Sequence, residues 1–239
     1  MTACYIEIDP FCAETLRKLV AADMIAPGDV IETSIEDVLP SDLSNYTQVH
    51  AFAGIGIWSL ALRNAGWGDH RTVWTASCPC QPFSAAGKGG GFDDERHLWP
   101  AFHWLVSQCK PGQLFGEQVR NAKWIDLAHA DLEGLGYAFG CTPMAACGFG
   151  APFVGDRAYW VASSDWDQQP RKEPRGGQAG RVGRFIEPVS QYTSWTTALA
   201  EFRVLDDGYP RCVGATDAIR NAMHAPTVTA FVKAVMEIM

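Results

Sequence analysis

Short apolar runs alternate with segments of helical periodicity along most of this chain, and no other feature restricts its fold as strongly. The runs typical of strands are residues 4–9, 47–52, 73–76, 113–119, 137–146 and 157–162. Helical spacing of apolar residues predicts helices over residues 11–22, 58–64, 98–109, 124–135 and 226–239. A further strand is expected within residues 30–38, and residues 40–46 read as a polar connection. The alternation predicts an α/β fold with a mostly parallel, doubly wound sheet and helices on both faces.

The chain is long enough to bury a full core, with 239 residues of which 47% are hydrophobic. Its composition changes at residue 163, because residues 163–184 are poor in aliphatic side chains and rich in Gly, Pro, Gln and Arg. We therefore expect a main domain over residues 1–162 and a small, loop-rich region over residues 163–208. Residues 209–239 are expected to return to the main domain.

Membrane, disulfide and metal sites are not expected. The chain has no apolar run of about 18–20 residues, and its N-terminus carries acids where a signal peptide would carry bases. Its eight cysteines form no CxxC pair, which favours reduced thiols over a structural zinc site. These features predict a monomeric cytoplasmic protein with no membrane or metal partner.

Charge is distributed unevenly along the chain. The net charge is −8, and residues 1–60 contain nine acids and two bases. In contrast, residues 171–184 contain five bases and one acid. The five bases are Arg171, Lys172, Arg175, Arg181 and Arg184. A basic loop on an acidic body is compatible with contact to nucleic-acid phosphates.

Three groups with chemical potential follow predicted strands. Cys80 lies between two prolines after the strand over residues 73–76, Glu117 lies near the end of the next strand, and Arg157 lies beside a later one. Neighbouring strand ends in a doubly wound sheet face one crevice, so the three groups are expected to surround a single planar ligand. A thiol, a carboxylate and a guanidinium so placed suit covalent catalysis on an electron-poor ring.

A glycine turn follows the strand over residues 47–52. Gly54 and Gly56 precede a predicted helix, and missing side chains at such a turn let a ligand approach the backbone at the helix N-terminus. Glu7 follows the first strand, where an acid either accepts hydrogen bonds from ribose hydroxyls or is simply solvated. The glycine-rich residues 84–94 suit either a mobile lid or a surface loop.

Two of these motifs resemble the DNA cytosine-5 methyltransferase family. They are Pro79-Cys80-Gln81-Pro82-Phe83-Ser84 and the preceding Phe52-Ala53-Gly54-Ile55-Gly56. Residues 87–96, 115–119, 148–162 and 220–223 resemble further motifs of that family. The resemblance implies a methyltransferase sheet in which residues 163–208 recognise the target.

The resemblance also implies a role for each site residue. Cys80 would add to carbon 6 of cytosine, which makes carbon 5 nucleophilic enough to accept a methyl group. Glu117 would hold ring N3 and the exocyclic amine, and Arg157 would contact the carbonyl at position 2. The target in double-stranded DNA would be flipped out of the helix, with Ser84 and the five loop bases contacting DNA. The methyl donor would be S-adenosylmethionine, bound by Phe52, Gly54, Gly56, Glu7, Pro79, Leu98 and Asn221.

The chain departs from the family in motif order and in several residues. The ribose-binding strand resembles residues 5–9, before the glycine turn rather than after it, and Asp29, Ser34 and Asp37 are alternative adenine-binding residues. Ile57 replaces a glycine and Arg220 another, and either side chain could crowd the cofactor. Phe153 and Val154 replace polar residues, Gly155 an arginine, and Gln118 an asparagine.

The motifs leave three functions open. The first is an active DNA cytosine-5 methyltransferase, which the retained Cys80 and Glu117 favour. The second is a catalytically weak relative that binds DNA or a protein partner, which the substitutions around the site favour. The third is an RNA cytosine-5 methyltransferase that uses the same chemistry.

Overall fold

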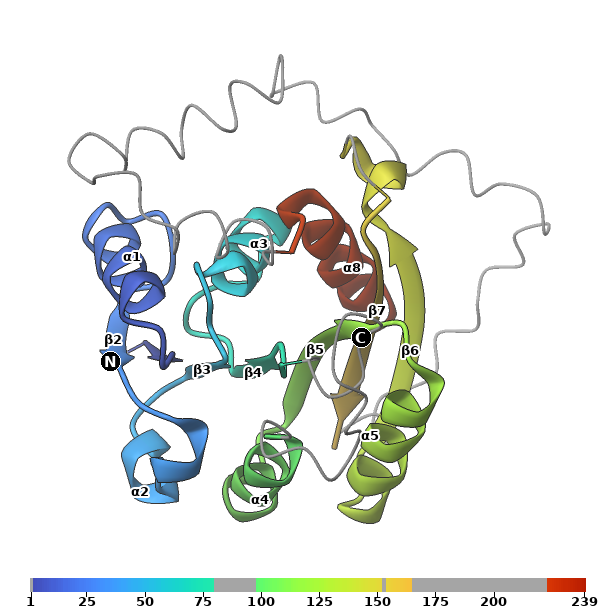
Figure 1. Cartoon of the computed structure of the whole chain (residues 1–239), viewed down its shortest axis with the longest axis horizontal. Coiled ribbons are helices and arrows are strands. Elements are labelled where there is room, and N and C mark those ends of the chain that lie inside the picture. Colours follow the sequence, from blue (N-terminus) through green and yellow to red (C-terminus); the bar gives the residue numbers. More distant parts are fainter. Residues whose placement is uncertain (1, 80–97, 152–153, 165–222) are drawn as a thin grey trace. The chain divides into compact units, whose positions relative to one another are not determined.

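The computed structural model describes residues 2–79, 98–151, 154–164 and 223–239 (Figure 1). In these described parts, seven strands form one sheet in the order β2-β1-β3-β4-β5-β7-β6. Strands β1 to β5 pair in parallel, whereas β7 runs antiparallel to both β5 and β6. The strands are β1 Ala3–Ile6, β2 Gly28–Ile31, β3 Gln48–Ala51, β4 Val73–Ala76, β5 Gln113–Val119, β6 Ala138–Ala145 and β7 Asp156–Ser163.

Helices cover both faces of this sheet, as the alternating sequence pattern predicts. Helices α1, α3 and α8 lie on one face, and α2, α4 and α5 lie on the other (Figure 1). Their bounds are α1 Pro10–Ala21, α2 Pro40–Leu43, α3 Ile57–Ala65, α4 Trp99–Cys109, α5 Ala122–Gly134 and α8 Ala225–Ile238. The 3-10 helices are η1 Ile35–Asp37 and η3 Ala146–Phe149. The predicted doubly wound α/β fold is therefore confirmed.

Two local predictions near the N-terminus are corrected by the structure. The expected polar connection over residues 40–46 contains α2, which Pro40 begins and in which Asp42 accepts a hydrogen bond from the backbone N–H of Leu39 at 2.9 Å. The second strand covers Gly28–Ile31, so it begins two residues before the expected range of residues 30–38 and only its last two residues lie within that range. Ser34 then caps η1 by accepting the backbone N–H of Glu36, which turns the chain away from the sheet.

Aromatic side chains fill the core on both faces. Trp99, Trp124 and Trp160 pack together under α4 and α5, and each is only 1% exposed. On the opposite face Phe231 of α8 packs against Phe115 of β5. Burying a phenylalanine side chain contributes roughly 1.5–3 kcal/mol, so the contact of Phe231 with Phe115 helps to hold the C-terminal helix on the sheet. None of the helices in the described ranges has the length and apolar character needed to cross a membrane.

A buried histidine at the centre of the sheet gives the fold a predicted pH dependence. His50 is 2% exposed, stacks on Tyr5 and shares a hydrogen bond of 2.8 Å between its Nδ1 and Thr75 Oγ1. Burial lowers the pKa of His50 from 6.5 to about 3, although the Asp69 carboxylate opposes the shift. The unfolded chain therefore binds a proton between pH 6.5 and 3 that the folded chain does not, and stability is lost as pH falls through this range.

We expect the free energy of unfolding to fall by roughly 1 kcal/mol from pH 6 to pH 5 on account of His50. Urea denaturation at both pH values measures this change. A His50→Gln variant should lose this part of the pH dependence, whereas His70→Gln, at an exposed histidine, should retain it. An equal pH dependence in wild type and His50→Gln would contradict the assignment.

Candidate active site

The sheet reverses its winding between β1 and β3. From β1 the chain moves outward to β2, then returns past β1 to β3 and continues in the other direction to β4 and β5. The connections after β1 and β3 therefore diverge, and such a switch point leaves a crevice at the carboxyl ends of the strands. Glu7 follows β1, and the glycine turn follows β3. Two segments that are far apart in the sequence thus meet at this crevice.

The Glu7 carboxylate links the ends of these two strands. Its Oε2 accepts the backbone N–H of Gly54 at 2.7 Å, and its Oε1 accepts that of Asp9 at 2.9 Å. Phe52, Gly54 and Gly56 all have positive φ, of 54°, 54° and 80°. The positive φ favours glycine at residue 54. A Cβ added there would meet no atom of the described residues within 4 Å, so the space beside Gly54 is open among these residues.

An exposed apolar residue belongs to the same edge and was missed from the sequence. Ile8 lies between Glu7 and Asp9 and is 64% exposed, although Ile6 two residues earlier is buried. The one signal in the sequence is an isoleucine placed between two acids just after a strand. An apolar surface beside a carboxylate can pack against a planar ligand whose hydroxyls the carboxylate binds.

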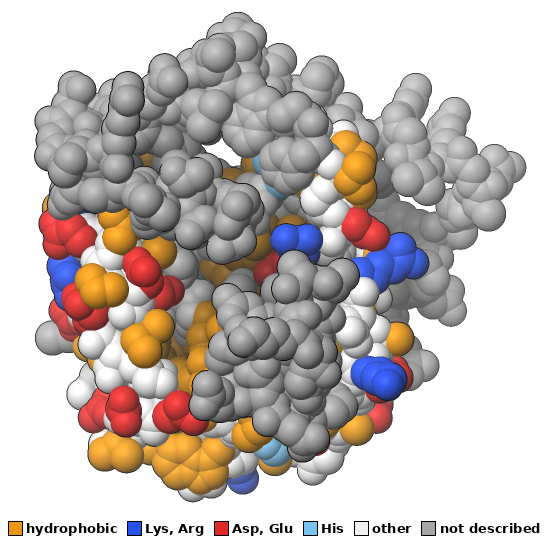
Figure 2. All heavy atoms as spheres, in the orientation of Figure 1, with side chains coloured by type: hydrophobic (Ala, Val, Ile, Leu, Met, Phe, Trp, Pro, Cys, Tyr) orange, Lys and Arg blue, Asp and Glu red, His pale blue; other side chains and the backbone are white. Residues whose placement is uncertain are grey.

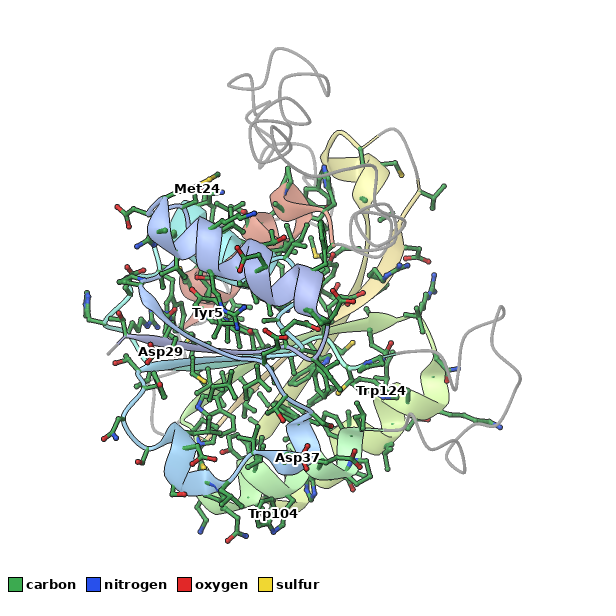
Figure 3. All side chains as sticks on the ribbon, turned by 60° about the vertical axis from the view of Figure 1, so that its left-hand side comes forward. Tyr5, Met24, Asp29, Asp37, Trp104 and Trp124 are labelled. Carbon is green, nitrogen blue, oxygen red and sulfur yellow. The ribbon has the colours of Figure 1, made fainter. Side chains whose placement is uncertain are left out.

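The three alternatives for an adenine-binding residue differ in position. Asp29 lies within β2, opposite Cys4 of β1, and its Oδ2 accepts the hydroxyl of Tyr46 at 2.7 Å. Ser34 and Asp37 follow the carboxyl end of β2, on the side of the crevice. Figure 3 shows Asp29 and Asp37 well separated. Of the three alternatives, Ser34 and Asp37 therefore lie beyond the strand end that borders the crevice, and Asp29 does not.

Glu117 and Arg157 are brought together across β5 and β7, as predicted. Arg157 Nε lies 2.8 Å from Glu117 Oε1, and Glu117 is 8% exposed. Burial raises the pKa of Glu117 from 4.5 to about 7, even though the Arg157 guanidinium acts to lower it. A carboxyl group with this pKa can either donate or accept a proton near neutral pH. Arg157 also donates to the backbone carbonyl of Asp156 at 3.1 Å.

The end of β4 is tied to β5 by a residue whose importance the sequence did not reveal. Gln118 Nε2 donates to the carbonyl of Cys78 at 3.3 Å, and Gln118 Oε1 accepts the backbone N–H of Val119 at 2.8 Å. Cys78 lies two residues before Cys80, so Gln118 orients the backbone that leads to the predicted nucleophile. The contact forms between residues 40 apart, so the sequence by itself shows Gln118 only as a replacement for an asparagine.

The neighbouring thiol of Cys78 is chemically different from a nucleophile. Cys78 is 7% exposed, and both burial and the Glu117 carboxylate raise its pKa. A thiol held neutral in this way is a poor nucleophile. On the other side of the β4 end, Ser77 Oγ lies 3.5 Å from Met223 Sδ, which places Met223, the last residue of the motif over residues 220–223, beside this strand end.

The remaining predicted residues divide into described and undescribed positions. Pro79 and Leu98 are described, at the two ends of residues 80–97. Gly155, which replaces an expected arginine, has φ +49° and accepts the backbone N–H of Ala146 at 3.3 Å. Ile57 is buried in the first turn of α3. Outside the described residues lie Cys80, Ser84, Phe153, Asn221, Arg220 and the basic residues Arg171, Lys172, Arg175, Arg181 and Arg184.

Comparisons with known proteins identify the family of this site. Residues 71–179 match the family model of the C-5 cytosine-specific DNA methylases. The Type II methyltransferase M.NaeI of Lentzea aerocolonigenes is 28% identical over 238 residues, covering 93% of this chain and 49% of that protein. M.NlaX of Neisseria lactamica, also a Type II methyltransferase, is 27% identical over 198 residues, covering 78% of this chain and 53% of that protein.

The chain spans about half the length of these curated relatives. Among solved structures, the methyltransferase EhMeth of Entamoeba histolytica matches with a TM-score of 0.47 and 14% identity, covering 71% of this chain and 45% of that one. The family match begins just before β4 and includes the strand end that precedes Cys80 together with Glu117 and Arg157. The chain therefore contains a C-5 cytosine-specific DNA methylase domain.

Proposed function

We propose that this chain is a DNA cytosine-5 methyltransferase that acts through a covalent bond between Cys80 and the target base. The observation that carries the proposal is the contact between the buried Glu117 carboxylate and the partly exposed Arg157 guanidinium, 2.8 Å apart at the end of β5. Through Gln118, the same strand end holds the backbone two residues before Cys80. A nucleophile, a tunable carboxyl group and a guanidinium are thus supplied by adjacent strands.

The chemistry assigned to these residues follows from the poor nucleophilicity of carbon 5 in cytosine. The Cys80 thiolate adds to carbon 6, and the electron pair displaced from the ring double bond increases the electron density on carbon 5. Glu117 holds ring N3 and the exocyclic amine, and its pKa of about 7 allows its protonated form to donate to N3. Arg157 holds Glu117 in place, and its side chain, 36% exposed, is available to the carbonyl at position 2.

The carboxyl edge of β1 and β3 fits S-adenosylmethionine, which when bound supplies the methyl group. The anchored Glu7 carboxylate suits ribose hydroxyls, and Gly54 of the glycine turn leaves open space next to the backbone among the described residues. Phe52 and the exposed Ile8 offer apolar surface for the adenine. Pro79, Leu98 and Asn221 complete the proposed binding residues, with Ser34 or Asp37 on the adenine side.

Duplex DNA is the proposed substrate, with the target cytosine flipped out at a cost of roughly a few kcal/mol. The relatives named Type II methyltransferase support DNA over RNA and a role in a restriction–modification system. On the face shown in Figure 2, acidic side chains gather over the α1 and α2 side of the sheet, and several Lys and Arg side chains lie toward β7. This charge distribution favours an approach of the phosphates from the β7 side. We place Ser84 and the bases of residues 171–184 among the DNA contacts.

The test is methyl transfer by the purified chain. With labelled S-adenosylmethionine and duplex DNA, we expect label at carbon 5 of cytosine. DNA that carries 5-fluorocytosine should form a complex that survives denaturation. DNA binding without transfer to any duplex would support the alternative of a catalytically weak binding protein. Transfer to RNA but not to DNA would support the RNA alternative.

Glu7 provides a separate test of the cofactor edge. A Glu7→Gln variant should bind S-adenosylmethionine roughly tenfold more weakly, since it loses the charge and one acceptor that organise the turn. Calorimetric titration measures the affinity. Glu14→Gln is the matched control, because Glu14 lies on exposed α1 surface and pairs with Arg17 and Lys18. Equal affinity in Glu7→Gln and wild type would reject the proposed cofactor edge.

A further inference from the structure

Glu117 follows a glycine whose missing side chain is replaced by a tryptophan from the neighbouring strand. Gly116 of β5 is directly opposite Trp160 of β7 in the antiparallel ladder. A Cβ added at Gly116 would overlap the Cε2 and Cζ2 atoms of Trp160. The indole thus occupies the position that a side chain at residue 116 would take, against the backbone of β5.

Gly116 and Glu117 face opposite sides of the sheet from β5. Successive side chains of a strand point to opposite faces, so Gly116 and Trp160 lie on the α4 and α5 face, whereas Glu117 points to the α3 and α8 face. Phe115 confirms the alternation, because it packs against Phe231 of α8. The indole therefore supports the strand from behind, at the residue just before the carboxyl group.

Trp160 has little freedom to move. Its ring stacks on Phe139 with centroids 5.9 Å apart, and Trp99 and Trp124 enclose it at 6.1 Å and 6.4 Å. Trp99 is itself held, because its Nε1 donates to Asp131 of α5 at 2.7 Å. Among the described residues Trp160 Nε1 has no hydrogen-bond partner, so ring packing determines its position. A side chain added at residue 116 must then displace β5 rather than the indole.

We propose that Trp160 and Gly116 act as a positioning pair that holds Glu117 at its contact with Arg157 and the target base. The inference deepens the proposed function and rests on it. Trp160 does not touch the base in this assignment and acts only through the backbone of β5. Glu7 and the glycine turn of the proposed cofactor site follow β1 and β3, whereas this pair lies on β5 and β7, so the pair acts mainly on the chemical step rather than on cofactor affinity.

The first test is Gly116→Ala. A displacement of about 1 Å at a catalytic group can cost roughly 10²-fold, and we expect a loss of this size in the rate of adduct formation with 5-fluorocytosine DNA. The affinity for S-adenosylmethionine should stay within about twofold of wild type. Gly140→Ala in β6 is the matched control, since its added Cβ would meet Val161 Cγ1 at 3.5 Å, an ordinary contact. Its adduct formation should be near wild type.

A second variant tests whether the two residues act together. Combining Gly116→Ala with Trp160→Leu removes the overlap. We expect the rate of adduct formation in this double variant to be at least about tenfold higher than in Gly116→Ala alone. The pH profile of adduct formation distinguishes a positioning role from a general loss of stability. The pKa assigned to Glu117 in this profile should change in Gly116→Ala and stay unchanged in Gly140→Ala. Wild-type activity in Gly116→Ala, or no recovery in the double variant, would overturn the proposal.

Two outcomes need a separate route. If Gly116→Ala does not fold, the variant Trp160→Phe is used in its place. We expect its rate of adduct formation to fall about tenfold and its pH profile to shift. An unchanged pH profile would overturn the proposal. If the wild-type chain forms no adduct, the proposed function fails, and the pair is tested through the Glu117 carboxyl by NMR titration. A pKa that differs between wild type and Gly116→Ala then supports the positioning pair, and an identical pKa overturns it.

Discussion

Cys80→Ser is expected to abolish the denaturation-resistant complex with 5-fluorocytosine DNA and to reduce methyl transfer on the order of 10⁴-fold or more, because a serine hydroxyl is a far weaker nucleophile than a thiolate. Denaturing gel electrophoresis measures the complex, and incorporation of labelled methyl groups measures the transfer. DNA binding should remain, since the substitution removes only the reacting sulfur. The effect on the covalent step should therefore be separable from any effect on affinity.

Cys78 provides a control two residues away. Its thiol is buried, and burial together with the Glu117 carboxylate raises its pKa, so Cys78 cannot supply the thiolate at neutral pH. Cys78→Ala should lower stability by about 1 kcal/mol while retaining the covalent complex. If the complex persisted in Cys80→Ser and was lost in Cys78→Ala, the nucleophile would be Cys78 and the assignment to Cys80 would be wrong.

Glu117→Gln is expected to lower methyl transfer by roughly 10²–10⁴-fold, because an amide cannot transfer a proton to ring N3. It should also change the pH dependence. In the wild type, the raised pKa of Glu117 means that the carboxyl group keeps its proton up to about pH 7 and loses it above that value. The rate that depends on the protonated form should therefore fall about tenfold per pH unit above this point.

Single-turnover rates between pH 6 and 9 measure this dependence. The alkaline decrease should be absent from the residual activity of Glu117→Gln. Glu133→Gln is the control, since Glu133 is on the surface of α5 and pairs with His129. An alkaline decrease that survives in Glu117→Gln would show that another group titrates, and would remove Glu117 from the proton-transfer step.

Much of the fold was predictable because strand and helix periods are local properties. The strand over residues 113–119 and the short run over residues 73–76 have the predicted bounds. The errors fall where local contacts end an element early, as at Ile31, or where a short helix has a polar sequence, as in α2. The sequence indicated Glu117 and Arg157 as members of one site, but they meet because β7 runs antiparallel to β5, which places the start of β7 at the carboxyl end of β5.

Other parts of the site depend on contacts that no local pattern contains. The roles of Gln118 and Trp160 arise from atoms that are 40 or more residues apart in the sequence. The position of Asp29 within β2, rather than beyond its carboxyl end, depends on the pairing of β1 with β2. Ile8 was missed because exposure of an apolar residue at a strand end is decided by what packs around it.

By itself, the sequence determined which residue types follow the strands: Cys80 between two prolines, an acid near the end of β5 and glycines after β3. Only the tertiary structure decided that β1 pairs with β3, so that Glu7 binds the N–H of Gly54, and that Glu117 is buried deeply enough to raise its pKa to about 7. The physical reason is that residue type and periodicity are read along the chain. Desolvation, strand order and steric overlap depend instead on the neighbours that folding brings together.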